Sequence, residues 1–129
     1  MVVVTGPRID PASLAAPPGV EVRGWVPDLH RLLAAADVAL VQGGLTTTME
    51  LTAAGRPFVY VPLQRHFEQN IHVRHRLERY GAGRCVSWAE ATPHRLADDL
   101  AALVGTAPKV APVDPGGAAR AAALLADLL

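Results

Sequence analysis

A buried strand that runs through a glycine turn into a helix is the feature that most constrains this fold. The strand is the apolar run Val38–Val41, the turn is Gly43-Gly44, and the helix begins at Leu45. Near-continuous apolar runs are typical of parallel strands that are covered on both faces, and such strands are joined by crossover helices. The segment therefore predicts a βαβ unit.

Strand and helix patterns alternate along the rest of the chain, so we expect an α/β fold with a Rossmann-like doubly wound parallel sheet. The other predicted strands are Met1–Thr5, buried on both faces, then Val20–Arg23, Phe58–Val61 and Gly83–Val86. The predicted helices are Leu29–Ala36 with Asp28 as N-cap, Leu45–Ala54 closed by Gly55, Glu68–Tyr80 closed by Gly81, Pro93–Val104 capped by Thr92, and a C-terminal Ala/Leu helix. Residues 1–106 are expected to form the domain, and residues 107–129 a Pro/Gly linker with that last helix.

Composition excludes several functional classes. The 129 residues carry a formal net charge of zero, which gives no electrostatic reason to expect binding to nucleic acid or to an anionic membrane. Cys85 is the only cysteine, so an internal disulfide and a cysteine-based zinc cluster are excluded. No apolar run approaches the ~20 residues of a membrane span, and no signal peptide is recognisable. A cytoplasmic protein is expected, and the Arg-, Ala- and Gly-rich composition suggests a bacterial source.

The glycine turn predicts an anion site. Backbone N–H groups at a helix N-terminus are unpaired and partly positive, glycines let a ligand approach, and Thr46 and Thr47 can add hydroxyl donors. Glu50 lies six residues after Gly44, where a carboxylate can accept hydrogen bonds from a ribose diol. The alternatives are a glycine pair that serves only strand–helix packing and a glutamate that is only solvated.

A second polar segment follows the next predicted strand, Phe58–Val61. It offers four side chains suited to sugar hydroxyls, which are Gln64, Glu68, Gln69 and Asn70. Ligands of open α/β sheets bind at the carboxyl ends of the strands, so this segment and the glycine turn should converge. The alternative for Glu68 is an acidic residue that only stabilises the start of its own helix.

These segments together resemble a known family. The run Gln42–Pro57, the pair Val61-Pro62 and the triplet Glu68–Asn70 are similar to the C-terminal, donor-binding domain of GT-B glycosyltransferases. The closest type is family 28 and the UDP-glycosyltransferases. The similarity covers about Val2 to Val104. The resemblance implies binding of a UDP-sugar, whose hexosyl group is transferred to an acceptor hydroxyl.

The resemblance also implies roles for particular residues. The diphosphate would bind at Gly43, Gly44, Leu45, Thr46 and Thr47. Glu50 would accept both ribose hydroxyls, and Glu68 and Gln69 would hold the sugar. Trp25 and Val26 would border the uracil ring. Gln42 departs from the His or Arg that often precedes the glycine turn, which leaves one phosphate contact open.

Family members begin this domain with a further βα unit, which has no counterpart here, and carry the general base in an N-terminal acceptor domain. The resemblance therefore transfers no catalytic residue to this chain, and it implies no metal and no cofactor apart from the UDP-sugar substrate. The partner would be an acceptor-binding domain or subunit, without which the chain is expected to be inactive. The alternatives are a non-catalytic nucleotide-sugar module, a subunit of a split transferase, a truncated fragment, and a same-fold UDP-sugar epimerase.

Other candidate residues have ordinary structural explanations. His72 and His75 have zinc-ligand spacing, but no third ligand is evident, so a solvated basic helix face is favoured. Trp25 is equally consistent with a core position. His66 follows the same strand as the second polar segment and is a weaker candidate contact, and Cys85 is expected to be a small apolar strand residue.

Overall fold

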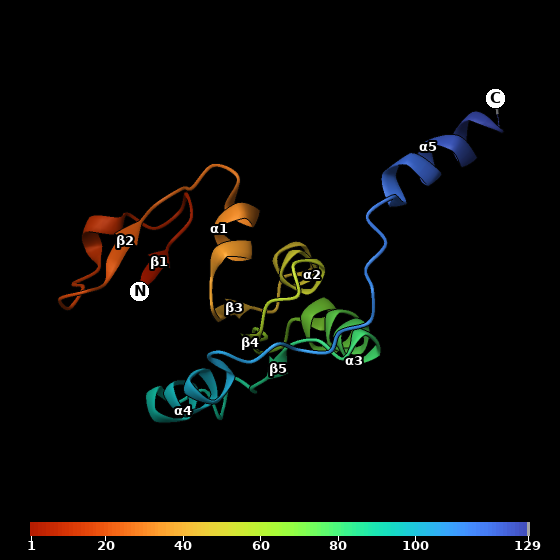
Figure 1. The fold of residues 1–129 in the computed structure, drawn as a ribbon. Helices are drawn as coiled ribbons and strands as arrows, with labels where there is room; N and C mark the ends of the chain where they lie inside the picture. The colour runs from red at the N-terminus through yellow and green to blue at the C-terminus, as the bar shows by residue number, and fades with distance from the viewer. Residues whose placement is uncertain (129) are drawn as a thin grey trace. The chain divides into compact units, whose positions relative to one another are not determined.

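The computed structural model describes residues 1–128, which belong to two compact units, Met1–Arg31 and Leu32–Leu129 (Figure 1). All strand pairs in the described chain are parallel, and helices connect the successive strands of the second unit. The predicted α/β class is confirmed. The strands form a two-stranded sheet, β1-β2, and a three-stranded sheet, β3-β4-β5.

The first unit contains strands β1 (Val2–Val4) and β2 (Glu21–Arg23), joined through the short 3-10 helix η1 (Pro11–Ser13). The expectation that the first strand is buried on both faces is wrong: Val2 is 41% exposed, and the other two strand residues are half-buried. Burial on both faces requires a layer on each side of a sheet. Within this unit, β1 pairs only with β2.

Helix α1 (Leu29–Ala35) crosses the division between the units. Asp28 precedes it, as predicted, but does not act as an N-cap. Its φ is 50°, whereas N-cap residues take an extended backbone. The Asp28 carbonyl accepts a hydrogen bond from the Arg31 N–H at 2.8 Å, and the Asp28 carboxylate lies 3.9 Å from Arg31 Nε. A tight backbone turn therefore starts this helix.

The second unit is built on three parallel strands in the order β3-β4-β5. The strands are β3 (Ala39–Gln42), β4 (Phe58–Val61) and β5 (Arg84–Cys85). The connecting helices are α2 (Leu45–Ala53), the π-helix η2 (Glu68–Val73) and α3 (Arg74–Tyr80), and β5 is followed by α4 (Pro93–Leu103) and α5 (Gly117–Ala126).

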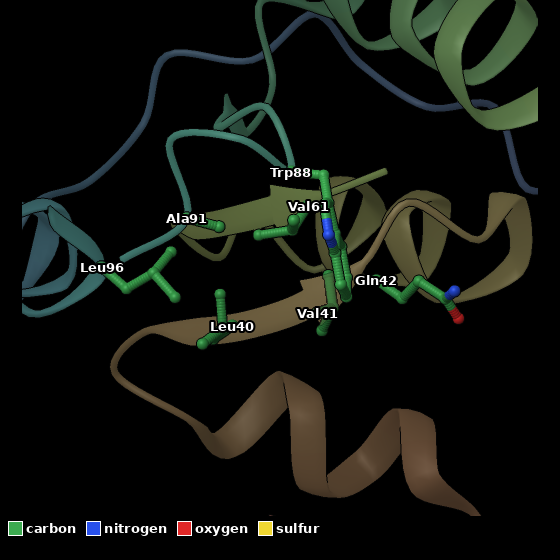
Figure 2. Close-up of a pocket in the computed structure, with 7 residues that line it drawn as sticks. All are labelled: Leu40, Val41, Gln42, Val61, Trp88, Ala91 and Leu96. Atoms are coloured by element: carbon green, nitrogen blue, oxygen red, sulfur yellow. The ribbon is translucent and has the colours of Figure 1, made fainter. Parts of the chain in front are cut away.

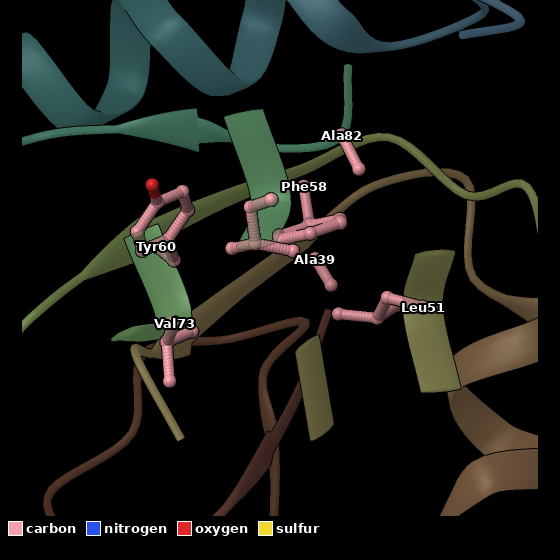
Figure 3. Close-up of a cluster of buried hydrophobic side chains, with 7 residues drawn as sticks. Ala39, Leu51, Phe58, Tyr60, Val73 and Ala82 are labelled. Atoms are coloured by element: carbon pink, nitrogen blue, oxygen red, sulfur yellow. The ribbon is translucent and has the colours of Figure 1, made fainter. Parts of the chain in front are cut away.

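One face of this sheet packs against α2 and α3 and forms the core (Figure 3). Phe58 and Tyr60 alternate on β4 and face this side. The other buried members of the cluster are Ala39, Leu51, Val73, Leu77 and Ala82. Burial is the main reason that the pKa of the Tyr60 hydroxyl is raised. Helix α4 packs against β4, and its Leu96 lines a cavity together with Leu40 and Val61.

Several predicted helix ends are confirmed. Gly55 and Gly81 follow their helices with φ of 62° and 64°, the left-handed conformation that glycine adopts without strain. Thr92 caps α4: its hydroxyl accepts a hydrogen bond from the Arg95 N–H at 3.3 Å, and Pro93 is the first helical residue. These ends follow from local chemistry.

The predicted C-terminal helix is also present, as α5. The segment before it is partly packed, because Val110 contacts the core cluster and the Ala111 N–H donates to the Tyr80 carbonyl at 2.9 Å. Leu124 and Leu125 on α5 are 67% and 64% exposed. In residues 1–128, no helix has the length and apolar character needed to cross a membrane.

Asp99 ties α4 to the sheet and makes the stability of the fold depend on pH. Its buried carboxylate accepts hydrogen bonds from Arg95 Nε at 2.6 Å and from Arg84 Nη1 on β5 at 2.7 Å. The hydrogen bond from Arg95, followed by the one from Arg84, lowers the pKa of Asp99. A lowered pKa in the folded state means that the ionised carboxylate stabilises the fold.

We therefore predict that Asp99→Asn lowers the free energy of unfolding at pH 7. This difference should shrink as the pH falls below about 4, where Asp99 of the unfolded chain becomes protonated, and should vanish below the lowered pKa of Asp99 in the folded state. Urea unfolding of the wild type and of Asp99→Asn between pH 7 and pH 3 measures this difference in free energy. A difference that is the same at every pH would show that the Asp99 charge contributes nothing.

Candidate functional site

The turns that follow β3 and β4 meet at one point. The last residue pair in this parallel ladder is Gln42–Val61, so Gly43 and Pro62 leave the sheet side by side. Gly43 is buried, and a Cβ atom on it would lie 3.3 Å from Pro62 Cα and 3.4 Å from Gln69 Cβ. The prediction that the two polar segments converge is therefore confirmed. Glycine at position 43 allows this close approach, because a Cβ atom there would have to push Pro62 or Gln69 away by a few tenths of an ångström.

Gly44, by contrast, has no structural need to be glycine. Its φ of −72° and ψ of 136° are accessible to any residue, and a Cβ atom on it would have no neighbour within 4 Å. It is the N-cap of α2, where Ser, Asp or Asn would supply a side-chain acceptor. Glycine at this position keeps open the space in front of the helix.

The start of α2 offers three free donors. Within residues 1–128, the N–H groups of Leu45, Thr46 and Thr47 have no hydrogen-bond partner, and no side chain caps them. The hydroxyl of Thr48 donates to the Gly44 carbonyl at 2.8 Å, and that of Thr52 donates to the Thr48 carbonyl at 2.7 Å. Those two threonines are therefore structural, whereas the hydroxyls of Thr46 and Thr47 have no such bond among the described residues.

Glu50 is a free acceptor on the same helix. It lies four residues after Thr46 and three after Thr47, so all three share one face of α2. The side chain is half-buried, and in the described part of the chain its carboxylate makes no hydrogen bond or ion pair. One helix face thus presents N–H donors at its start and a carboxylate acceptor one turn further on.

The segment after β4 is held by side-chain to backbone hydrogen bonds. Gln69 is 8% exposed, and its Oε1 accepts from the Leu63 N–H at 2.9 Å. The Asn70 amide donates to the Leu63 carbonyl at 2.8 Å and to the His66 carbonyl at 2.7 Å. The Asn70 amide N–H groups therefore order the turn and leave its Oδ1 as the free polar atom, while Gln69 retains only its amide N–H groups.

Glu68 is exposed and makes no side-chain hydrogen bond within residues 1–128. It begins η2. The helix expected over Glu68–Tyr80 is present, but in two forms: residues Glu68–Val73 are π-helical, and the α-helix α3 follows. The wider π turn coincides with the hydrogen bonds around Gln69 and Asn70. Such turns are rare and are frequent at functional sites.

The opposite face of the sheet carries a cavity that the sequence did not predict. Its volume is about 490 Å³, and it is lined by Leu40, Val41, Gln42, Val61, Trp88, Ala91 and Leu96. Figure 2 shows the Trp88 indole lying across the ends of β3 and β4, near Val61 and Gln42. Trp88 is 57% exposed, so the cavity has an aromatic wall open to solvent. Trp88, two residues after the predicted strand Gly83–Val86, is the sequence signal that could have indicated it.

Trp25 and Val26 belong to the first unit. Trp25 is 70% exposed, which rules out the alternative that it is a core residue. Val26 is half-buried. In the described part of the chain, no three His, Cys, Asp or Glu side chains are grouped closely enough to hold a metal ion.

Comparisons with known proteins agree with this architecture. The model of the glycosyltransferase family 28 C-terminal domain matches residues 9–128. An uncharacterized glycosyltransferase of Methanopyrus kandleri is 35% identical over 112 residues, which cover 86% of this chain and 32% of that protein. A UDP-N-acetylglucosamine–N-acetylmuramyl-(pentapeptide) pyrophosphoryl-undecaprenol N-acetylglucosamine transferase of Sorangium cellulosum is 33% identical, over 81% of this chain and 27% of the relative.

Among solved structures, the crystal structure of the glycotransferase of kitacinnamycin is similar, with a TM-score of 0.62 and 31% sequence identity. The similarity covers 95% of this chain and 29% of that protein. The chain thus spans about a third or less of the length of these relatives. This chain is a member of the family of glycosyltransferase family 28 C-terminal domains.

Proposed function

We propose that this chain is the donor-binding domain of a glycosyltransferase and that it binds a UDP-sugar at the start of α2. The proposal depends on one observation: Gly44, the N-cap of α2, is a glycine although neither its backbone conformation nor its packing requires one. A closely approaching ligand explains it. Three unpaired N–H groups behind Gly44 favour an anionic ligand.

In the proposed site, the diphosphate binds at Gly43, Gly44, Leu45, Thr46 and Thr47. When the sugar is transferred, negative charge grows on the departing nucleoside diphosphate, and preorganised N–H dipoles stabilise it. The Glu50 carboxylate accepts hydrogen bonds from the two ribose hydroxyls. Glu68 accepts from sugar hydroxyls, and the free amide of Gln69 donates to a sugar oxygen. Trp25 and Val26 are proposed to border the uracil ring.

We further propose that residues 1–106 form this donor-binding domain and that residues 107–129 link it to the rest of the enzyme. The acceptor site and the general base would come from an additional domain or from a separate subunit, as the family resemblance implies. The length of the relatives, about three times that of this chain, supports this arrangement.

Glu50→Gln tests the proposed site. We expect it to weaken UDP binding by about 10-fold, because a neutral amide accepts weaker hydrogen bonds from the ribose diol than a carboxylate does. Isothermal titration calorimetry with UDP and with 2′-deoxy-UDP measures this. The substitution should cost less affinity for 2′-deoxy-UDP, which lacks one of the two hydroxyls.

Glu78→Gln is the matched control. Glu78 is an exposed glutamate on α3 whose carboxylate pairs with Arg74 Nε at 3.0 Å, so its substitution should leave the UDP affinity unchanged. Equal UDP affinity in the wild type and in Glu50→Gln would contradict the ribose assignment. No UDP binding by the wild type would contradict the proposed function itself.

A further inference from the structure

We infer that Arg65 supplies the positive charge for the diphosphate in this donor site, an inference that rests on the proposed function. Arg65 lies on the segment that leaves β4 and packs on the glycine turn. Pro62 lies three residues before Arg65 and Gln69 four residues after it. Both lie next to Gly43, since a Cβ atom on Gly43 would contact them.

The backbone of Arg65 is in the left-handed region, with a φ of 62°. It is the third residue of a four-residue turn, Leu63 to His66, which is closed by a hydrogen bond from the His66 N–H to the Leu63 carbonyl at 3.2 Å. Glycine or asparagine is usual at such a position, because a Cβ atom is strained there. A turn of this shape would form more readily with glycine.

The surrounding hydrogen bonds impose this conformation. Gln69 holds the Leu63 N–H, and Asn70 holds both the Leu63 and the His66 carbonyls, so both ends of the turn are anchored. The fold thus explains the shape of the turn but not the choice of arginine. In residues 1–128, the Arg65 guanidinium makes no hydrogen bond or ion pair, and the residue is exposed. A strained residue without a structural role points to function.

The proposed diphosphate site has little positive charge of its own. Residues 42–47, which form the proposed diphosphate site, carry no charged side chain. A helix N-terminus contributes about half a unit of positive charge, well below the charge of a diphosphate. Guanidinium groups bind phosphate oxygens through paired, charge-assisted hydrogen bonds. Arg65 is the one arginine on the segment that contacts Gly43, since that segment runs from Pro62 to Gln69.

Arg65→Gly tests the role of the charge, because it removes the guanidinium group while relieving the backbone strain. We expect its melting temperature to be unchanged or higher by up to about 3 °C, because the strain is relieved. We expect its affinity for UDP to fall by about 10-fold, and its affinity for UMP to fall less, because UMP lacks the second phosphate. Arg65→Lys should stay within about 3-fold of the wild type, because the charge is retained.

Calorimetric titrations at several salt concentrations provide a second measurement. The UDP affinity of the wild type should depend more steeply on salt than that of Arg65→Gly, since one ionic contact is lost. Arg76→Gln, which removes an exposed charge from α3, is the control and should match the wild type.

The outcomes separate this inference from the proposed function. If Glu50→Gln weakens UDP binding but Arg65→Gly binds UDP as tightly as the wild type, the inference is wrong and the proposed site stands. If Arg76→Gln loses as much affinity as Arg65→Gly, only the overall charge matters and the inference is again wrong. If the wild type does not bind UDP, both fail.

Discussion

Gly44→Asp is expected to leave the fold at least as stable as the wild type and to weaken UDP binding by about 100-fold. Aspartate is a favourable N-cap, because its carboxylate accepts hydrogen bonds from the first N–H groups of the helix. A Cβ atom at Gly44 has no neighbour within 4 Å, so the fold can accommodate the new side chain. The same carboxylate would occupy the proposed diphosphate position and repel the ligand.

Thermal unfolding and calorimetric titration with UDP, performed on the same preparation, measure both effects. Gly44→Ser is the matched variant, since serine caps the helix without a charge. We expect it to lose less affinity than Gly44→Asp, and the difference reports on charge repulsion. A variant that is more stable but binds less tightly cannot be explained by misfolding. Undiminished UDP binding by Gly44→Asp would show that the phosphates do not lie at the start of α2.

Gly83→Ala is expected to destabilise the second unit by about 3 kcal/mol and to lower its melting temperature by about 15 °C. The φ of Gly83 is 67°, which is strained for alanine. In addition, the new Cβ would overlap the Phe58 ring, at 2.6 Å from Cζ and closer still to Cε2. Phe58 is 1% exposed and central in the core, so its ring has no free space to move into.

Gly81→Ala is the control for this prediction. Gly81 has nearly the same backbone, with a φ of 64°, but the nearest atom to its Cβ would be the Lys109 carbonyl oxygen at 3.6 Å. Only backbone strain remains, and we expect a loss of about 1 kcal/mol. Urea unfolding of both variants gives the free energies. Equal losses would show that the Phe58 ring moves aside without cost.

Much of the local structure could be predicted from the sequence, because it depends on neighbouring residues. Thr92 followed by Pro93 starts a helix through a side-chain acceptor and a preset φ, and Gly55 and Gly81 end helices because they adopt positive φ without strain. Asp28 shows the limit of such reasoning. It is a good capping residue, but a φ of 50° prevents it from capping α1.

The candidate site also has some features that the sequence predicted and others that it did not. The convergence of the two polar segments followed from parallel strands alone, and the contact of Gly43 with Pro62 and Gln69 confirms it. The different uses of Glu68, Gln69 and Asn70 could not be predicted, since all three are polar and adjacent. Which of them binds Leu63 and which stays free depends on a π-helical turn that no residue pattern signals.

The chain alone therefore specified its α/β class, most of its helix ends and the strand edge at which the two polar segments meet, because these depend on periodicity and on short-range hydrogen bonding. Tertiary structure decided which groups are available there. It showed that Gly43 packs closely on Pro62 and Gln69 whereas Gly44 does not, and it held Arg65 in a left-handed turn. The Gly43 contact joins residues distant in sequence, and the Arg65 turn depends on the side-chain hydrogen bonds of Gln69 and Asn70, so no simple residue pattern predicts either one.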